Sequence, residues 1–414
     1  MSVDRGYLSP FYLYISIMKL RFVLVGLLLG CISVFATDKP KRNVTGLLQD
    51  QSLYEVVSGK EKKHDWLHVY FDMHAGFNLN FHNGLDNGRF SVRDLKISAK
   101  GTVTPWLSYS YCQRLNRSND GVSRADNLPA SIDYALVSLK PMAGLTLNLG
   151  KQCAAFGGYE FDMLPIEVYE FSDILEHMDC YMTGATLIWN MSDKQELQMQ
   201  LLNGLNNSAE ETFGKVYQSQ ASKVPLLYAL NWNGSLGGAH KSRWSVSAMN
   251  ELKGEWLYYV AIGNSWTFSD VDFYIDAMYS HEGVDKSGIV SMLIPEEKRT
   301  GASGLSGNVR NTRYFSLVSR LNYHFAPKWN AFAKGMYDTA GVYQDSEGVS
   351  AGQYRTAWGY QAGVEFFPMK TNFRFFLTYT GRSYIHHTRA LDLGARDYHT
   401  HRLSAGFVYQ LPVF

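Results

Sequence analysis

Hydrophobic and polar positions alternate along residues 67–81. Every odd position is apolar, whereas positions 68, 72, 74, 78 and 80 carry His, Asp, His, Asn and Asn. Side chains of a β-strand point alternately to opposite faces, so this stretch has one apolar face and one polar face. It is longer than the about 5–6 residues common in soluble strands, and longer than the about 9–11 residues that a tilted strand needs to cross a bilayer. The pattern therefore predicts a transmembrane β-barrel with a lipid-facing side and a wet lumen.

The same alternation recurs in fifteen further segments between residues 95 and 411, which gives sixteen strands in all. In one of these segments the lipid-facing positions are assigned to Leu257, Tyr259 and Ala261. An even number of antiparallel strands is typical of bacterial outer-membrane barrels. The sequence thus predicts an all-β fold, a transmembrane antiparallel up-and-down barrel of sixteen strands that occupies residues 66–414.

The connections between these segments fall into two classes that alternate along the chain. Short ones are predicted at 104–105, 141–144, 190–194, 233–243, 267–270, 326–328 and 368–372. Longer ones are predicted at 82–89, 115–131, 151–182, 203–223, 281–312, 338–353 and 381–400, with a shorter one at 250–255. Outer-membrane barrels have short periplasmic turns and long extracellular loops, so the alternation supports this class. Seven tryptophans lie beside the short turns and predict a periplasmic aromatic girdle: Trp66, Trp106, Trp189, Trp232, Trp244, Trp266 and Trp329.

The N-terminus has the features of an export signal. An apolar run at 22–35 follows Lys19 and Arg21 and ends in Val-Phe-Ala, which predicts a signal peptide over 1–36 with Met18 as the true start. Alternatively, the Leu-Leu-Gly sequence before Cys31 resembles a lipoprotein cleavage box. Residues 37–65 are polar and charged and are expected to form a periplasmic extension.

Composition narrows the function. The 414 residues carry a formal net charge of +1, so charge gives no reason to expect a nucleic-acid partner. Aromatic residues make up 14% of the chain and mean hydropathy is −0.20, which excludes a helical membrane protein but suits a barrel with a polar lumen. The sequence lacks the motifs of serine hydrolases, zinc proteases and nucleotide-binding loops, so no enzyme activity and no cofactor is expected.

Three cysteines remain after the signal peptide: Cys112, Cys153 and Cys180. Cys153 and Cys180 flank one long loop and could close it with a disulfide, or all three could be inert thiols. No metal-ligand spacing involves them. Histidines cluster in the last long connection and could bind a metal, although a solvated loop is the ordinary explanation: His386, His387, His399 and His401.

Several short segments resemble one porin family. They are RFSVRDLKI at 89–97 with Gly101 and Trp106, GKQ at 150–152, FGGYE at 156–160 and VYEFS at 168–172. The chain is similar here to the phosphate-selective porin O/P family, in its Bacteroides-type version. The resemblance implies a homotrimer of sixteen-stranded barrels in the outer membrane of a Gram-negative bacterium, where small hydrophilic solutes or ions, including anions such as phosphate, diffuse passively. Contacts with lipid and lipopolysaccharide follow from that location.

Strand parity assigns charged residues to the lumen. Six are acidic: Asp72, Asp94, Glu196, Asp272, Asp276 and Glu365. Nine are basic: Lys96, Lys100, Arg114, Lys140, Arg320, Lys334, Arg374, Arg382 and Arg402. Rings of basic side chains favour anions, so this excess could make the pore anion-selective. Alternatively the bases pair with neighbouring carboxylates and give no selectivity.

The third long loop, 151–182, argues in the other direction. In sixteen-stranded porins this loop commonly folds inward and narrows the pore. Here it carries seven carboxylates against Lys151: Glu160, Asp162, Glu167, Glu170, Asp173, Glu176 and Asp179. An acidic constriction repels phosphate, so a weakly cation-selective or unselective channel is expected. Alternatively, the acids lie outside the barrel or bind a divalent cation.

The C-terminal segment from Ser404 to Leu411, followed by the terminal Phe414, looks like the signal that barrel assembly machinery recognises. Pro412 shifts the parity of Phe414 relative to that strand. Two alternative functions stay open. One is a channel for hydrophobic substrates of the fatty-acid type, which has fourteen strands and an N-terminal plug. The other is a non-transporting adhesin or structural barrel.

Overall fold

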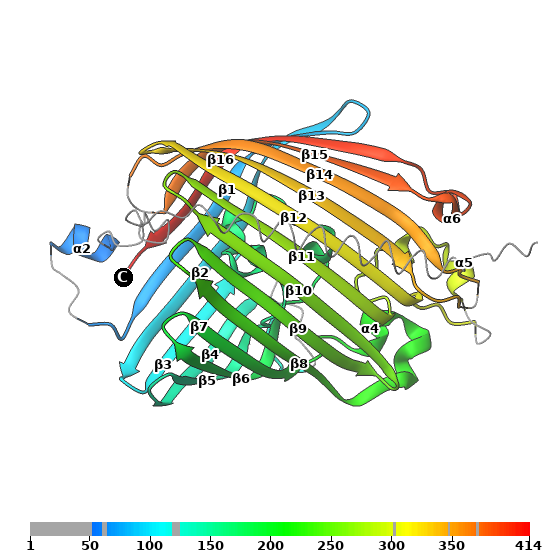
Figure 1. The fold of residues 1–414 in the computed structure, drawn as a ribbon, viewed down its shortest axis with the longest axis horizontal. Coiled ribbons are helices and arrows are strands. Elements are labelled where there is room, and N and C mark those ends of the chain that lie inside the picture. The colour runs from blue at the N-terminus through cyan, green and yellow to red at the C-terminus, as the bar shows by residue number, and fades with distance from the viewer. Residues whose placement is uncertain (1–51, 60–63, 118–124, 301–303, 347, 370–371) are drawn as a thin grey trace, which may run out of the picture. The chain divides into compact units, whose positions relative to one another are not determined.

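The computed structural model describes residues 52–59, 64–117, 125–300, 304–346, 348–369 and 372–414. Sixteen strands pair antiparallel with their neighbours in chain order, and β16 pairs with β1 to close the barrel (Figure 1). This confirms the predicted fold. The fourteen strands of a fatty-acid-type channel do not fit it. The strands are β1 (His68–Phe81), β2 (Leu85–Thr104), β3 (Leu107–Arg114), β4 (Ile132–Met142), β5 (Leu145–Cys153), β6 (Tyr181–Ser192), β7 (Gln195–Asn203), β8 (Ala221–Leu236), β9 (His240–Leu252), β10 (Glu255–Thr267), β11 (Val271–Val284), β12 (Arg310–Ala326), β13 (Trp329–Val342), β14 (Gly352–Phe366), β15 (Phe373–His386) and β16 (Tyr398–Pro412).

Short helices occupy the connections and the N-terminal segment. Those at the N-terminus and in the β5–β6 loop (residues 154–180) are α2 (Leu53–Ser58), η3 (Glu160–Asp162), η4 (Pro165–Glu167) and α3 (Asp173–Glu176). The later loops hold α4 (Ala209–Phe213), η5 (Lys215–Gln220), η6 (Ser291–Leu293), α5 (Glu296–Arg299) and α6 (Thr388–Leu391). None of the helices in the described ranges is long and apolar enough to span a membrane.

Alternation along each strand separates two faces. In β14, Trp358 and Tyr360 are 52% and 47% exposed, whereas Ala357 just before them and Gln361 just after them are 0% and 2% exposed. The barrel therefore turns one apolar side of each strand outward, where lipid replaces water.

The assignment for β10 was wrong. Leu257, Tyr259 and Ala261 face inward and are buried, whereas Tyr258 and Val260 are exposed on the outside. Both faces of this strand are apolar, so the alternation carried no information about direction. The inner face is apolar because it packs against loops inside the barrel rather than against water.

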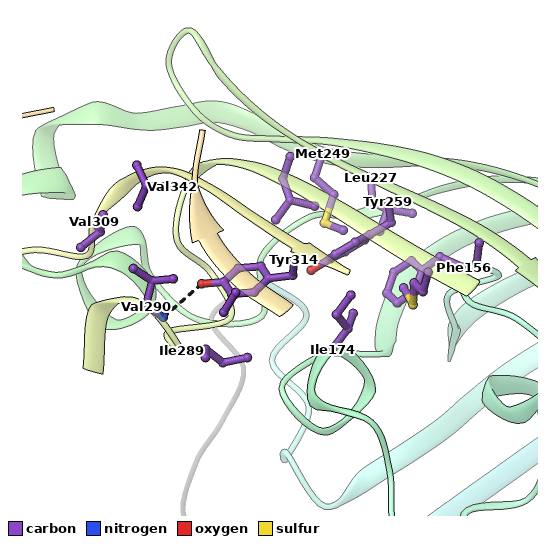
Figure 2. Packing of buried hydrophobic residues seen from close by; sticks show 14 of the residues in the cluster. Phe156, Ile174, Leu227, Met249, Tyr259, Ile289, Val290, Val309, Tyr314 and Val342 are labelled. Atoms are coloured by element: carbon purple, nitrogen blue, oxygen red, sulfur yellow. Dashed lines mark hydrogen bonds between the residues drawn. The ribbon is translucent and has the colours of Figure 1, made fainter. Parts of the chain in front are cut away.

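An apolar cluster fills part of the interior (Figure 2). Its wall residues come from the successive strands β6 to β14. Phe156 and Ile174 of the β5–β6 loop pack there with Ile289 and Val290 of the β11–β12 loop (residues 285–309). The wall contributes further buried side chains to the same cluster: Leu227, Met249, Tyr259 and Tyr314. Two loops that are far apart in sequence therefore pack against one apolar section of the inner wall.

The predicted alternation of short and long connections has two exceptions. Only 82–84 separate β1 from β2, and only 253–254 separate β9 from β10. The predicted long loop 82–89 is mostly strand, because β1 and β2 continue past the rim as a paired hairpin (blue in Figure 1). Phe90 on this hairpin is 85% exposed and its ring lies 4.9 Å from that of Phe77.

Most girdle tryptophans are exposed, with values between 41% and 56% for Trp66, Trp106, Trp189, Trp244 and Trp329. Trp266 differs from them. It is 7% exposed, with its ring 5.7 Å from that of Phe273 and 5.2 Å from that of His240.

The N-terminal helix α2 contacts the end of the chain. Ser52 caps this helix in a reciprocal box with Glu55. The Tyr54 amide donates to the carbonyl of Val413 at 3.1 Å, and the Tyr54 ring lies 4.9 Å from that of Phe414. The predicted signal peptide, the start at Met18 and the alternative at Cys31 fall outside the described residues.

Candidate functional site

The β5–β6 loop leaves the end of β5 and contacts the inner wall strand by strand before it returns to β6. Its first anchor is on β11, where Asp276 accepts hydrogen bonds from the backbone N–H groups of Tyr159 (2.8 Å) and Glu160 (2.6 Å). The Glu160 side chain, fully buried, forms an ion pair with Lys334 of β13. Lys334 also donates to the carbonyl of Glu170. One wall lysine therefore binds both ends of the loop's central section.

Tyr169 is the second anchor. Its hydroxyl donates to Glu365 Oε1 at 2.7 Å and accepts from Arg374 Nε at 3.2 Å. Its ring stacks on Phe332 with an interplanar angle of 11°. The guanidinium of Arg320 lies 4.0 Å from the ring centroid of Phe332, so the stack has a cation above it. Burial and the neighbouring carboxylate raise the pKa of Tyr169, which keeps the phenol protonated as a donor.

Asp173 is the third anchor. It forms ion pairs with Arg355 of β14 and with Arg382 of β15, the latter at 2.5 Å. Arg382 also contacts Asp338 of β13 at 3.1 Å, and the Asp173 amide donates to Asp338 Oδ1 at 3.2 Å. The start of α3 is therefore bound on one side by two guanidinium groups and on the other by a carboxylate.

A β-bulge adds a contact that alternation alone could not place. The register shifts between His74 and Ala75, which leaves Arg93 unpaired on β2 and lets it donate to the carbonyl of Tyr169 at 2.6 Å. Arg402 of β16 reaches the same carbonyl at 3.0 Å and the Glu170 carboxylate at 2.6 Å.

Seven of the nine predicted lumen bases have a carboxylate partner. Lys96 and Arg114 share Asp133, at 3.2 and 2.8 Å. Arg320 and Arg374 share Glu365, at 3.6 and 3.3 Å. The other three bind the β5–β6 loop: Lys334, Arg382 and Arg402. The remaining two, Lys100 and Lys140, are exposed, and Lys100 lies 5.2 Å from the ring centroid of Tyr70.

The seven loop carboxylates divide by their surroundings. Glu160 and Asp173 are buried in the ion pairs described above, and Glu170 is half-buried against Arg402. The Asp162 carboxylate contacts Arg243 of β9 at 3.1 Å while its side chain is 63% exposed. Glu176 and Asp179 are exposed and Glu167 is half-buried.

Cys112, Cys153 and Cys180 are free thiols in the structure. The Ala154 amide donates to the carbonyl of Cys180 at 2.7 Å, so the two ends of the loop lie side by side. The disulfide between Cys153 and Cys180 stays a prediction. In the described ranges no three histidines, cysteines or carboxylates are grouped as metal ligands.

Several residues of the site were not predicted. Parity could have placed Arg243 and Asp338, which were assigned to connections because those strands are longer than expected. Arg355 was missed as well, because it lies close to the start of β14, next to the predicted connection 338–353. Arg93 needs the bulge, and Tyr169 needs the path of the loop, which no periodic signal describes.

A closed barrel with an outward apolar surface and charged groups on its inner wall defines an outer-membrane porin of a Gram-negative bacterium. The family model for phosphate-selective porin O and P matches residues 67–411, and the chain belongs to this family of channels. None of the curated proteins searched matches the chain.

Solved outer-membrane channels share the fold at low identity. The channel DcaP of Acinetobacter baumannii is 9% identical with a TM-score of 0.55, over 85% of this chain and 99% of that one. An anion-selective porin from Comamonas acidovorans is 9% identical with a TM-score of 0.51, over 83% and 99%. A loop-deletion mutant of OmpT from Vibrio cholerae is 11% identical with a TM-score of 0.51, over 83% and 98%. At this identity the likeness concerns the fold alone.

Proposed function

We propose that this porin is a passive diffusion channel for small hydrophilic solutes, narrowed by the β5–β6 loop, with weak cation selectivity or none. The observation that carries the proposal is the set of ion pairs between loop carboxylates and wall bases, Glu160 with Lys334, Glu170 with Arg402 and Asp173 with Arg382. These pairs neutralise the wall charges that would otherwise attract anions.

The charges left facing water do not favour phosphate. The exposed carboxylates of Glu176 and Asp179 lie on the loop, whereas Lys100 and Lys140 are the exposed bases among the nine predicted for the wall. These exposed charges give the channel neither a dominant positive nor a dominant negative potential, so a phosphate ion gains little electrostatic free energy on entry. The family name therefore does not transfer to the solute, and we propose no catalytic role.

Ion selectivity tests this proposal directly. The purified protein in a planar bilayer should give stable conductance steps, with a reversal potential near zero or of cation-selective sign across a KCl gradient. E176Q/D179N should move the reversal potential toward chloride without changing the docked pairs. Strong chloride preference in the unmodified protein would contradict the proposal.

We also propose a homotrimer, as family membership implies, in contact with outer-membrane lipid and lipopolysaccharide. The segment from Ser404 to Leu411, with Phe414, is proposed to engage the barrel assembly machinery. Native mass measurement in detergent, compared with the heat-denatured chain, tests the trimer.

A further inference from the structure

The wall formed by β3 to β7 differs from the wall that holds the loop. Across these strands directly paired residues form a row of uncharged polar side chains: Ser108 with Ser138, Ser138 with Asn148, Asn148 with Thr186, and Thr186 with Gln200. Paired residues of an antiparallel ladder point to the same face, so the row is continuous. One position along, Leu149 and Leu201 are 38% and 46% exposed on the outside, which places the row inside.

A second row lies beside the first. It runs from Thr146 through Ile188 and Gln198 to Asn231. Within the described strands β3 to β7, the charged side chains of the inner face lie near strand ends, at Arg114 and Asp133 on one side and at Lys140 and Glu196 on the other. The centre of this wall thus carries hydroxyl and amide groups.

The loop leaves most of this wall uncovered by its strongest contacts. Its ion pairs fall on β13, β14, β15 and β16, with Asp162 reaching β9. On β7 the Ala155 amide donates to Gln200 Oε1 at 2.5 Å, close to where the loop begins. The half-buried Ser138, Thr146 and Asn148 retain contact with solvent.

Such a wall suits solutes without charge. A hydroxyl-rich molecule that leaves bulk water needs donors and acceptors at close spacing to replace lost hydrogen bonds, and hydroxyl and amide groups supply both. An ion needs a counter-charge instead, which the centre of this wall lacks. We propose that uncharged, hydroxyl-rich solutes of the sugar and polyol class pass along the β3–β7 wall. This inference rests on the proposed channel function.

Liposome swelling with the full-length protein tests the solute class. An uncharged hexose should enter faster than the corresponding hexuronate or amino-hexose, and faster than inorganic phosphate. S138A/T146V removes two half-exposed hydroxyls from the wall, and the hexose rate should fall about threefold because hydrogen bonds to the solute are lost. KCl conductance should stay within about twofold, since pore width and charge are retained.

S247A/T312V is the matched control. It makes the same Ser-to-Ala and Thr-to-Val changes on β9 and β12, where Ser247 and Thr312 are 2% and 0% exposed and beyond reach of a solute. The hexose rate should not change. An equal loss of hexose entry rate in both variants, or faster entry of phosphate or hexuronate than of hexose, would overturn the proposed solute class. If the protein still conducts in that case, the proposed porin function is unaffected. Absence of any conductance from the unmodified protein would overturn both.

Discussion

At the scale of single residues, Tyr169 contacts the inner wall through its hydroxyl, its backbone carbonyl and its ring. Its hydroxyl lies between Glu365 and Arg374, its carbonyl accepts from Arg93 and Arg402, and its ring packs in a cluster with Phe332. Burial of the ring stabilises the docked loop, and the polar contacts determine where along the wall the loop lies.

Removing only the hydroxyl separates these effects. Y169F retains the stacked ring but leaves Glu365 and Arg374 without their shared partner, so loop docking should weaken by about 1.5–3 kcal/mol. Y169A also loses the ring and should cost about 3–5 kcal/mol. Cleavage by a Glu-specific protease under native conditions measures the loop's opening, because carboxylates lie throughout it and no Lys or Arg lies within 154–180. Y228F, on the exposed outer face, is the control and should leave cleavage unchanged.

The buried pair of Lys334 and Glu160 should be more sensitive to a single change than to a double one. K334Q leaves a carboxylate without its cation in a site that excludes water, at a cost of about 3–5 kcal/mol in loop docking. E160Q/K334Q removes both charges and should recover most of that loss. Native-state hydrogen exchange of residues 154–180 in both single variants and the double variant gives the coupling free energy, and unlike Glu-specific cleavage it does not depend on the glutamates being changed. Additive losses would show that the pair does not hold the loop. E167Q provides a control on the same loop.

Alternation predicted the lumen side of Lys334, Arg374, Arg382 and Arg402 because a polar side chain at an inward position leaves a period-two signal. Their partners were out of reach of that signal, since the loop follows tertiary contacts. Arg93 was missed because one inserted residue reverses parity on β2.

At the scale of elements, the buried carboxylate of Asp285 helps to hold the β11–β12 loop in place. Asp285 accepts from Gly288 and Ser291 backbone amides, both at 2.8 Å, and from the Tyr314 hydroxyl at 2.6 Å. The Ser291 hydroxyl adds a fourth bond at 2.6 Å. Burial nevertheless raises the pKa of Asp285 above its ordinary value.

This raised pKa predicts a pH dependence for the loop. The folded loop holds the Asp285 proton more tightly than the open loop does. The contribution of this proton to the stability of the folded loop is therefore fully present below the ordinary carboxyl pKa of about 4, and it is lost as pH rises through the folded-state pKa. Hydrogen exchange of 285–309 should therefore accelerate with pH beyond the intrinsic chemical rate. In D285N that excess should shrink, with an overall loss of about 1–3 kcal/mol from the missing acceptor. An unchanged excess in D285N would place the titration elsewhere, with Glu282 as the nearest other carboxyl along the chain.

Two element-level predictions failed for physical reasons. In β10 both faces are apolar, and only the loops inside the barrel decide which is inward. The connection predicted at 82–89 is hairpin because paired strands satisfy their backbone hydrogen bonds in water as well as in lipid. The polar residues of this segment have the composition of a loop, although its backbone is that of a paired strand.

At the scale of the whole molecule, closure depends on the pairing of β1 with β16. Beyond the last ladder pairs, the Val69 amide donates to the carbonyl of Phe414 at 2.8 Å, and the Val413 amide donates to the carbonyl of Val69 at 2.8 Å. The Phe414 ring lies 4.9 Å from Tyr54 and 6.5 Å from Trp66. The terminal residue thus closes the seam in the folded barrel while standing at the end of the proposed assembly signal.

Two substitutions distinguish those roles. F414A and Y54A both remove the Tyr54–Phe414 ring contact, but F414A alone alters the terminal residue. If the ring serves only the folded seam, both variants should lose a similar stability of about 1–2 kcal/mol on detergent unfolding and accumulate equally in the outer membrane. If assembly machinery reads Phe414, the F414A yield of heat-modifiable barrel should fall about tenfold in cells, far below Y54A, while refolding into detergent stays comparable. We expect the second outcome, because the backbone bonds that close the seam do not need the ring. Equal yields of the two variants would contradict it.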